Sequence, residues 1–112
     1  MKTTKLFLLA ITAIFILAGC SKDETPQVDK VTYNKDVKSI FLSKCTPCHL
    51  EGGINPSKFD DYNTAKAKID AILLRVNLDP TAQGFMPKNG TKLSASEINT
   101  LTMWKTDGTL EN

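Results

Sequence analysis

The residues that could do chemistry are concentrated in one short stretch, SKCTPCHLEG, residues 43–52. It contains two of the three cysteines, Cys45 and Cys48, and the only histidine of the chain, His49. On a helical turn these three residues take positions i, i+3 and i+4, so their side chains leave one face. We place the stretch at the end of a helix, with a turn that begins or bends at Pro47. Two sulfurs and an imidazole on one short face suit three kinds of chemistry.

Two of these are a structural zinc site and a dithiol redox pair. Structural zinc needs four ligands, and apart from Cys20 the chain has no further cysteine or histidine, so an aspartate would have to take part. A redox pair normally follows a strand and opens a helix, whereas Cys45 and Cys48 follow an amphipathic helical pattern. A plain disulfide between them would leave His49 without a role. These alternatives stay open at this point.

The third chemistry is covalent attachment of haem, because Cys-x-x-Cys-His is the c-type attachment signature. The spacing lets each thiol add to one of the two vinyl groups at the edge of the macrocycle, and the next residue then reaches the iron. We therefore expect one haem c, bound through Cys45 and Cys48, with His49 as an iron ligand.

The sixth position of the iron separates an electron carrier from a catalyst. A thioether ligand stabilises reduced iron and raises its potential. Of the three methionines, Met1 is lost with an export signal, and Met103 falls in a helical pattern, where it would serve packing. Met86 lies in the loop sequence GFMPKNG. We expect Met86 to be the second axial ligand, and the alternative is an ordinary loop or core methionine.

Helical periodicity identifies the elements that would position these residues. In a first helix Asn34 can act as the cap, and in a second, DDYNTAKAKIDAILLRV, Asp60 or Asp61 can do so. A third begins with a capping box, Ser94 and Glu97. The apolar positions of the three patterns are Val37, Ile40 and Phe41, then Tyr62, Ala65, Ile69, Ile72 and Val76, then Ile98, Leu101 and Trp104.

Gly108 would end the third helix, and two long loops, LEGGINPSKF and NLDPTAQGFMPKNGTKL, separate the three patterns. No run alternates as a strand, so the sequence predicts an all-α domain. Loops of this length without structure of their own are uncommon unless something organises them.

The N-terminal sequence MKTTKLFLLAITAIFILAGC has the pattern of an export signal. Its apolar run is too short for a membrane span, although a retained anchor helix is the alternative. Leu17-Ala18-Gly19-Cys20 resembles the lipobox of bacterial lipoproteins. The resemblance implies cleavage before Cys20 and lipid on its sulfur and its amino group. Ser21, a residue other than aspartate after the cysteine, favours the outer membrane, and Lys22-Asp23-Glu24 resembles a surface-export signal, so we expect a periplasmic or surface-facing location there.

Removal of the signal also removes Lys2 and Lys5, which leaves twelve basic residues against twelve acidic ones. The mature chain is thus close to neutral, and without a basic stripe it is not expected to bind nucleic acid. Its first residues, CSKDETPQVDKV, are polar and read as a flexible tether. We expect a signal at residues 1–19, a tether at 20–32 and one domain at 33–112, small enough to need a cofactor for stability.

VTYNKDVKSIFLSKCTPCH and GFMPKNGTKLSASEINTLTMW together resemble a small class I cytochrome c domain. The resemblance covers roughly residues 33–108. It implies a cytochrome c-like fold of three main helices and long loops around one haem, with Cys45 and Cys48 as thioether positions and His49 and Met86 as ligands. It also places Phe41 and Trp104 where the first and last helices cross. The family pattern is loose between the motif and Met86, so haem propionate contacts are not assigned.

The function expected from these residues is electron transfer by a lipid-anchored monohaem cytochrome, with iron that cycles between Fe(III) and Fe(II). We expect protein redox partners, attachment to the membrane through the lipid, and a monomer. The alternatives need an open sixth position: a peroxidase-like enzyme, which the lack of a second histidine disfavours, or a gas-binding haem sensor.

Overall fold

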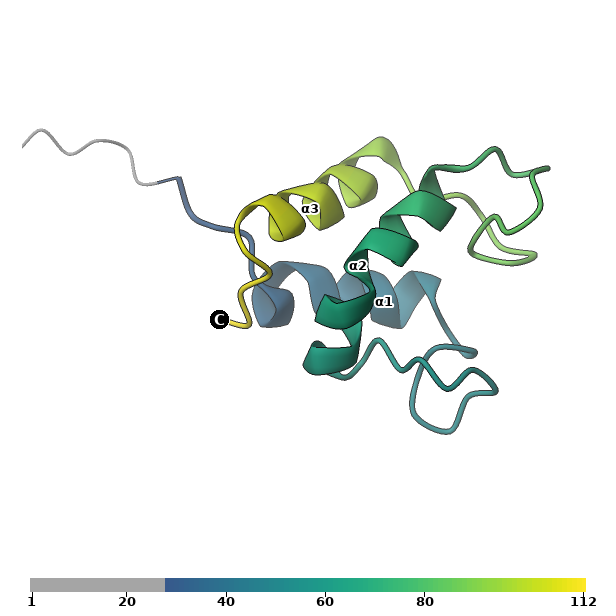
Figure 1. Ribbon diagram of the computed structural model, residues 1–112, viewed down its shortest axis with the longest axis horizontal. Coiled ribbons are helices and arrows are strands. Elements are labelled where there is room, and N and C mark those ends of the chain that lie inside the picture. The colour runs from purple at the N-terminus through teal and green to yellow at the C-terminus, as the bar shows by residue number, and fades with distance from the viewer. Residues whose placement is uncertain (1–27) are drawn as a thin grey trace, which may run out of the picture.

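The computed structural model describes residues 28–112. The expected signal at residues 1–19, the lipidation residue Cys20 and the tether up to residue 27 lie outside the described residues. Within the described part the chain forms a π-helical turn η1 (Tyr33–Val37) that continues as α1 (Lys38–Lys44), then α2 (Tyr62–Asn77) and α3 (Ala95–Thr106). Figure 1 shows that the two long loops extend from the end of the helices that lies away from the C-terminus. The prediction of an all-α domain with three main helical segments is confirmed.

The first helix begins differently from the prediction. Its N-cap is Thr32, with extended backbone, and Asn34 lies inside the helical segment. The Asp36 carboxylate accepts a hydrogen bond from Thr32 N at 2.8 Å, which supplies the start signal that we had attributed to Asn34. The side chain of Asn34 instead bonds to Asn112 at 2.7 Å. The cap prediction at Asn34 is therefore wrong, because the helix starts two residues earlier, as a π-helical turn capped at Thr32.

The second and third helices begin as predicted. The Asp61 side chain accepts from Thr64 N at 2.8 Å and caps α2. Ser94 and Glu97 form a reciprocal capping box at the start of α3. At its other end α3 is followed by Gly108, whose φ of 97° lies in the left-handed region that favours glycine at this position.

The core lies where η1 and α1, α2 and α3 meet. Phe41, Leu101 and Trp104 are fully buried, as the sequence predicted. The remaining buried members are Tyr33, Val37, Ile40, Phe59, Ala65, Ile69, Ile72, Val76 and Leu93. Met103, which we expected to serve packing, is 37% exposed and does not belong to this core. It follows Thr102 on the solvent side of α3, which leaves Trp104 as the core position.

Tyr33 connects the first and last helices. Its ring lies 5.8 Å from that of Trp104 and 6.4 Å from that of Phe41, measured between centroids. The Trp104 indole donates to Leu110 O at 2.8 Å, and Tyr33 N donates to the same carbonyl at 2.9 Å. The two ends of the described chain are thus held together around one aromatic cluster.

Residues just before η1 already belong to this arrangement. Val31 N donates to Asp107 Oδ2 at 2.8 Å, and Thr32 forms an isolated parallel bridge with Leu110. Asp29 Oδ2 also lies 3.8 Å from Lys35 Nζ of η1, so contacts with the domain begin four residues before the predicted boundary at residue 33. Within residues 28–112 no helix is long and apolar enough to cross a membrane.

Replacing Tyr33 with Phe tests the link between this cluster and the loop after α1. The Tyr33 hydroxyl donates to Phe59 O at 2.6 Å, and burial, aided by the charges of Asp60 and Asp61, raises the pKa of Tyr33 to about 12. The hydroxyl therefore stays protonated and able to donate. Because the substitution leaves a buried carbonyl without its donor, Tyr33→Phe should lower the free energy of unfolding by about 1–2 kcal/mol in denaturant titrations.

The matched control is Tyr62→Phe, which removes the hydrogen bond from a half-buried hydroxyl to Thr109 O. Water can replace the lost partner there, so the effect should be smaller. Equal losses in the two variants would contradict the role given to Tyr33.

Candidate functional site

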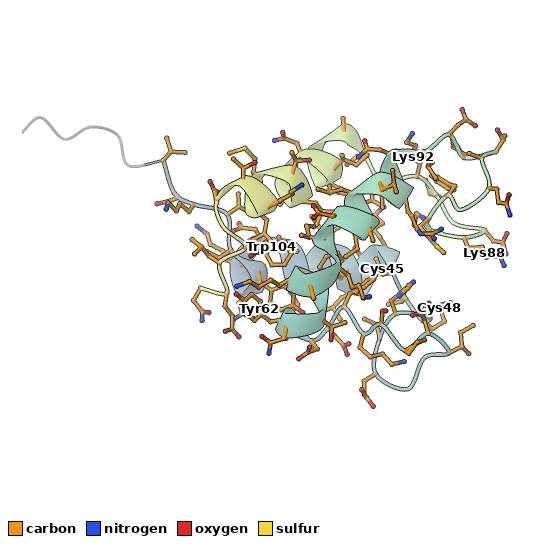
Figure 2. All side chains as sticks on the ribbon, in the orientation of Figure 1. Cys45, Cys48, Tyr62, Lys88, Lys92 and Trp104 are labelled. Atoms are coloured by element: carbon orange, nitrogen blue, oxygen red, sulfur yellow. The ribbon has the colours of Figure 1, made fainter. Side chains whose placement is uncertain are left out.

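The segment Cys45–His49 follows α1 directly. The helix ends at Lys44 and Cys45 is its C-cap, so CTPCH forms a separate turn and is not the last turn of the helix as we had expected. His49 N donates to Cys45 O at 3.0 Å, which closes the turn and holds the first cysteine and the histidine together. Figure 2 shows Cys45 beside the helices and Cys48 farther out in the loop. The sequence correctly predicted that one turn gathers all three residues, although not the type of turn.

The two thiols are free and differ in their surroundings. Cys45 packs against the core, and burial raises the pKa of its thiol to about 11. A dithiol redox pair needs a thiol whose pKa is lowered, so that the thiolate can attack. The environment of Cys45 has the opposite effect and disfavours that alternative.

The imidazole of His49 is held on two sides. Its Nδ1 lies 2.9 Å from Ser57 O, and its ring stacks on Phe59 with centroids 4.4 Å apart and an interplanar angle of 5°. A carbonyl oxygen can only accept, so Nδ1 must carry the proton of this hydrogen bond. In the neutral ring Nε2 then keeps its lone pair and is the nitrogen available to a metal.

The loop after His49 folds back on the CTPCH turn to make these contacts. Asn55 N donates to Cys48 O at 3.0 Å, and Phe59 N donates to His49 O at 2.7 Å. Gly53 lies so close to the turn that a Cβ there would overlap Pro47 O and stand 2.5 Å from Cys48 O. Only glycine fits this approach, and the loop therefore depends on it.

Met86 comes from the other long loop. It is half-buried, follows the buried Phe85, and its N donates to Arg75 O at 3.3 Å at the end of α2. Both loops project from the same end of the molecule (Figure 1). No hydrogen bond between described residues joins Met86 to the segment Cys45–His49, so the structure holds each of the two in place separately.

Three residues important to the site were missed in the sequence. Ser57 contributes only its backbone carbonyl, and no side-chain pattern announces such an acceptor. Gly53 could have been noticed as one of two adjacent glycines near the motif, and Phe59 as the one aromatic residue of its loop. Their partners become visible only once the loop is folded.

The donor atoms fit a covalently bound haem better than a protein-held metal ion. Two free thiols, separated by two residues, are followed at once by an imidazole that is held with Nε2 free. Among residues 28–112 no group of three or more His, Cys, Asp or Glu side chains could hold a metal ion. The mixed zinc site with an aspartate therefore has no counterpart in the described chain.

The family model described as cytochrome C oxidase, cbb3-type, subunit III, matches residues 34–104, which is 71 of the 112 residues. The chain belongs to this family of cytochrome c domains. No curated protein and no solved structure matches the chain. Family membership implies covalently bound haem c and electron transfer, and the three helices, without strands, agree with the cytochrome c fold. Cys45 and Cys48 are present where the attachment motif requires them.

Replacing Gly53 with Ala tests how the cytochrome c domain builds its attachment turn. The added Cβ would meet two backbone oxygens, which cannot move aside as a flexible side chain can. We expect the loop to shift, the free energy of unfolding of the holoprotein to fall by about 1–3 kcal/mol, and a smaller fraction of the protein to carry haem when measured by mass spectrometry.

Ile54→Ala is the control, because this neighbouring side chain is 92% exposed and should be neutral for both measurements. A Gly53→Ala protein as stable and as fully loaded as the control would contradict the close approach seen here.

Proposed function

We propose that the protein is a monohaem electron carrier of the bacterial cell envelope, with Cys45 and Cys48 as thioether positions and with His49 and Met86 as the two axial ligands. The haem, when bound, supplies an iron that alternates between Fe(III) and Fe(II) and so carries one electron at a time. The observation that supports this most strongly is the hydrogen bond between His49 Nδ1 and Ser57 O.

That hydrogen bond gives His49 one defined role. With its proton held at Nδ1, the ring offers Nε2 as a ligand, and the stacked Phe59 limits rotation of the ring. A carbonyl partner also makes the imidazole a stronger donor to iron than a free ring would be. A fixed ligand changes little between oxidation states, which suits electron transfer.

Met86 is proposed as the second ligand for reasons of chemistry and placement. A thioether is one of the ligands by which cytochromes c raise their potential, and Met86 lies in the loop that projects from the same end of the molecule as the attachment turn. Met103, by contrast, belongs to α3 and not to a loop, and its side chain is 37% exposed. With both axial positions filled by side chains, no position remains for a substrate.

The only histidine of the chain is committed to the iron in this proposal. A peroxidase-like reaction would require a further group to move protons beside an open sixth position. The carrier is therefore the function that the available side chains support best, and protein redox partners follow from the family.

Replacing Met86 with Ala should remove the weak far-red absorption band that marks sulfur ligation of ferric iron. The reduced variant should also bind carbon monoxide, which the wild-type protein should not do readily. Met103→Ala, which removes the other thioether of the mature chain, should leave both properties as in the wild type.

A wild-type protein that lacks the far-red band, or that binds carbon monoxide readily, would contradict the carrier proposal. It would then favour an enzyme or a gas sensor with an open sixth position.

The proposed location rests on the N-terminal sequence. Leu17-Ala18-Gly19-Cys20 resembles a lipobox, and the residues that follow are polar. We propose that Cys20 carries the lipid, that the segment between Cys20 and the first domain contact at Asp29 tethers the domain to the outer membrane, and that the domain works as a monomer. Haem attachment outside the cytoplasm is consistent with such an export signal.

Cys20→Ser should abolish lipid attachment while Cys45 and Cys48 remain able to take haem. Because the sulfur that carries the lipid is lost, we expect the variant to leave the membrane fraction or to keep its signal unprocessed, as judged by fractionation and by the mass of the chain. Thr25→Ser, a similar change within the proposed tether, should stay with the membrane. A Cys20→Ser protein that is processed and membrane-bound like the control would contradict the lipid anchor.

A further inference from the structure

The loop that carries Met86 is fastened to the end of α2 mainly through one residue, Arg75. The carbonyl of Arg75 accepts two hydrogen bonds, from Leu78 N at 3.4 Å and from Met86 N at 3.3 Å. The first ends the helix, and the second brings the chain back after eight further residues. The same carbonyl therefore fixes both the start of the loop and the backbone of Met86.

The side chain of Arg75 adds a second attachment two residues before Met86. Its Nη1 donates to Gly84 O at 3.0 Å. Gly84 has a φ of +89°, and a Cβ at this position would stand 2.8 Å from Nη1. The guanidinium thus lies directly against a glycine in the left-handed region, where any other residue would be strained and would push it away.

The rest of the loop is organised by short-range bonds that do not reach Met86. Asp79 Oδ1 accepts from Thr81 N and Oγ1, and Phe85 N donates to Ala82 O at 3.2 Å. Lys92 Nζ donates to Leu78 O at 3.0 Å and ties the far end of the loop to the same helix end. Arg75 is the residue whose backbone and side chain both hold the segment Gly84–Met86.

We propose that Arg75 is the positioning residue of the Met86 thioether: it keeps the loop closed so that the sulfur stays available to the iron. The inference rests on the proposed function, in which Met86 is an axial ligand. It assigns Arg75 a role in ligand occupancy and none in direct contact with the cofactor. A residue of this kind acts on the fraction of molecules in which the loop is open.

Binding of imidazole to the ferric holoprotein measures that fraction, because imidazole can take the sixth position only where Met86 has left it. The apparent dissociation constant is the intrinsic one divided by the fraction of open molecules. Arg75→Ala keeps the backbone carbonyl and removes only the bond to Gly84 O. An exposed, charge-assisted hydrogen bond of this kind should be worth about a fivefold change in the open fraction, so imidazole should bind about fivefold more tightly.

The measurement is made at about pH 8, where imidazole is largely neutral, together with the far-red band and a denaturant titration. Lys68→Ala is the matched control, because it removes an exposed positive charge from α2 at a site with no hydrogen bond or ion pair among the described residues. Arg75→Lys keeps the charge and a donor, and should stay closer to the wild type than Arg75→Ala does.

Tighter imidazole binding in Arg75→Ala than in Lys68→Ala, with a weakened far-red band and a retained fold, supports the inference. Equal imidazole affinity and equal band intensity in these two variants overturn it, while the ligand role of Met86 stands. Absence of the far-red band from the wild type overturns both the inference and the proposed ligand.

Discussion

The hydrogen bond between His49 Nδ1 and Ser57 O is the constraint on which the site depends. A histidine that follows two cysteines can offer either ring nitrogen, and the carbonyl of Ser57 decides which one. The ring also lies flat against Phe59, so both its tautomer and its orientation are set before any metal is considered. These contacts form only because the loop after His49 folds back onto the turn Cys45–His49. Gly53 permits this return, since its backbone lies against the carbonyls of Pro47 and Cys48.

The helices form most of the core, and the loops carry the functional residues. The three helical segments bury one small core, in which Tyr33 and Trp104 join the first helix to the last. The functional residues lie outside that core on two long loops at one end of the molecule (Figure 1). Each loop is anchored by a few specific contacts: Tyr33 and Phe59 for the first, Arg75 and Lys92 for the second. Long loops without regular structure are stable here because their attachment points are defined.

Local signals in the sequence were sufficient for much of this architecture. The capping box of Ser94 and Glu97 and the buried positions of α2 follow from side-chain type and spacing alone, and the cap of α2 was narrowed to Asp60 or Asp61, of which the structure shows Asp61. The start of the first helix did not, because Asp36 bonds backward to Thr32 and a π-helical turn replaces the expected cap. This start of the helix also involves the C-terminal segment, because Thr32 pairs with Leu110, and helical periodicity cannot show that contact.

The attachment motif was recognisable from five residues, whereas its supports were not. Ser57 acts through its backbone carbonyl alone, and Arg75 acts through its carbonyl as well as its side chain. Every residue possesses a carbonyl, so the backbone part of these contacts leaves no signal in the sequence. The spacing of Cys45, Cys48 and His49 predicted that they share one turn. It did not show that this turn is separate from α1, which ends at Lys44. Only the folded structure shows that each loop returns to the segment from which it starts, the first at His49 and the second at Arg75.

The central claim is that the turn Cys45–His49 carries a covalently attached haem, and mass spectrometry tests it most directly. The protein is produced in a host that attaches haem outside the cytoplasm, extracted with acidified acetone to remove loosely bound haem, and digested. The account predicts that the peptide containing Cys45 and Cys48 has gained the mass of one haem and that both thiols are blocked. A peptide of unmodified mass, with both thiols free to react with an alkylating reagent, would contradict it.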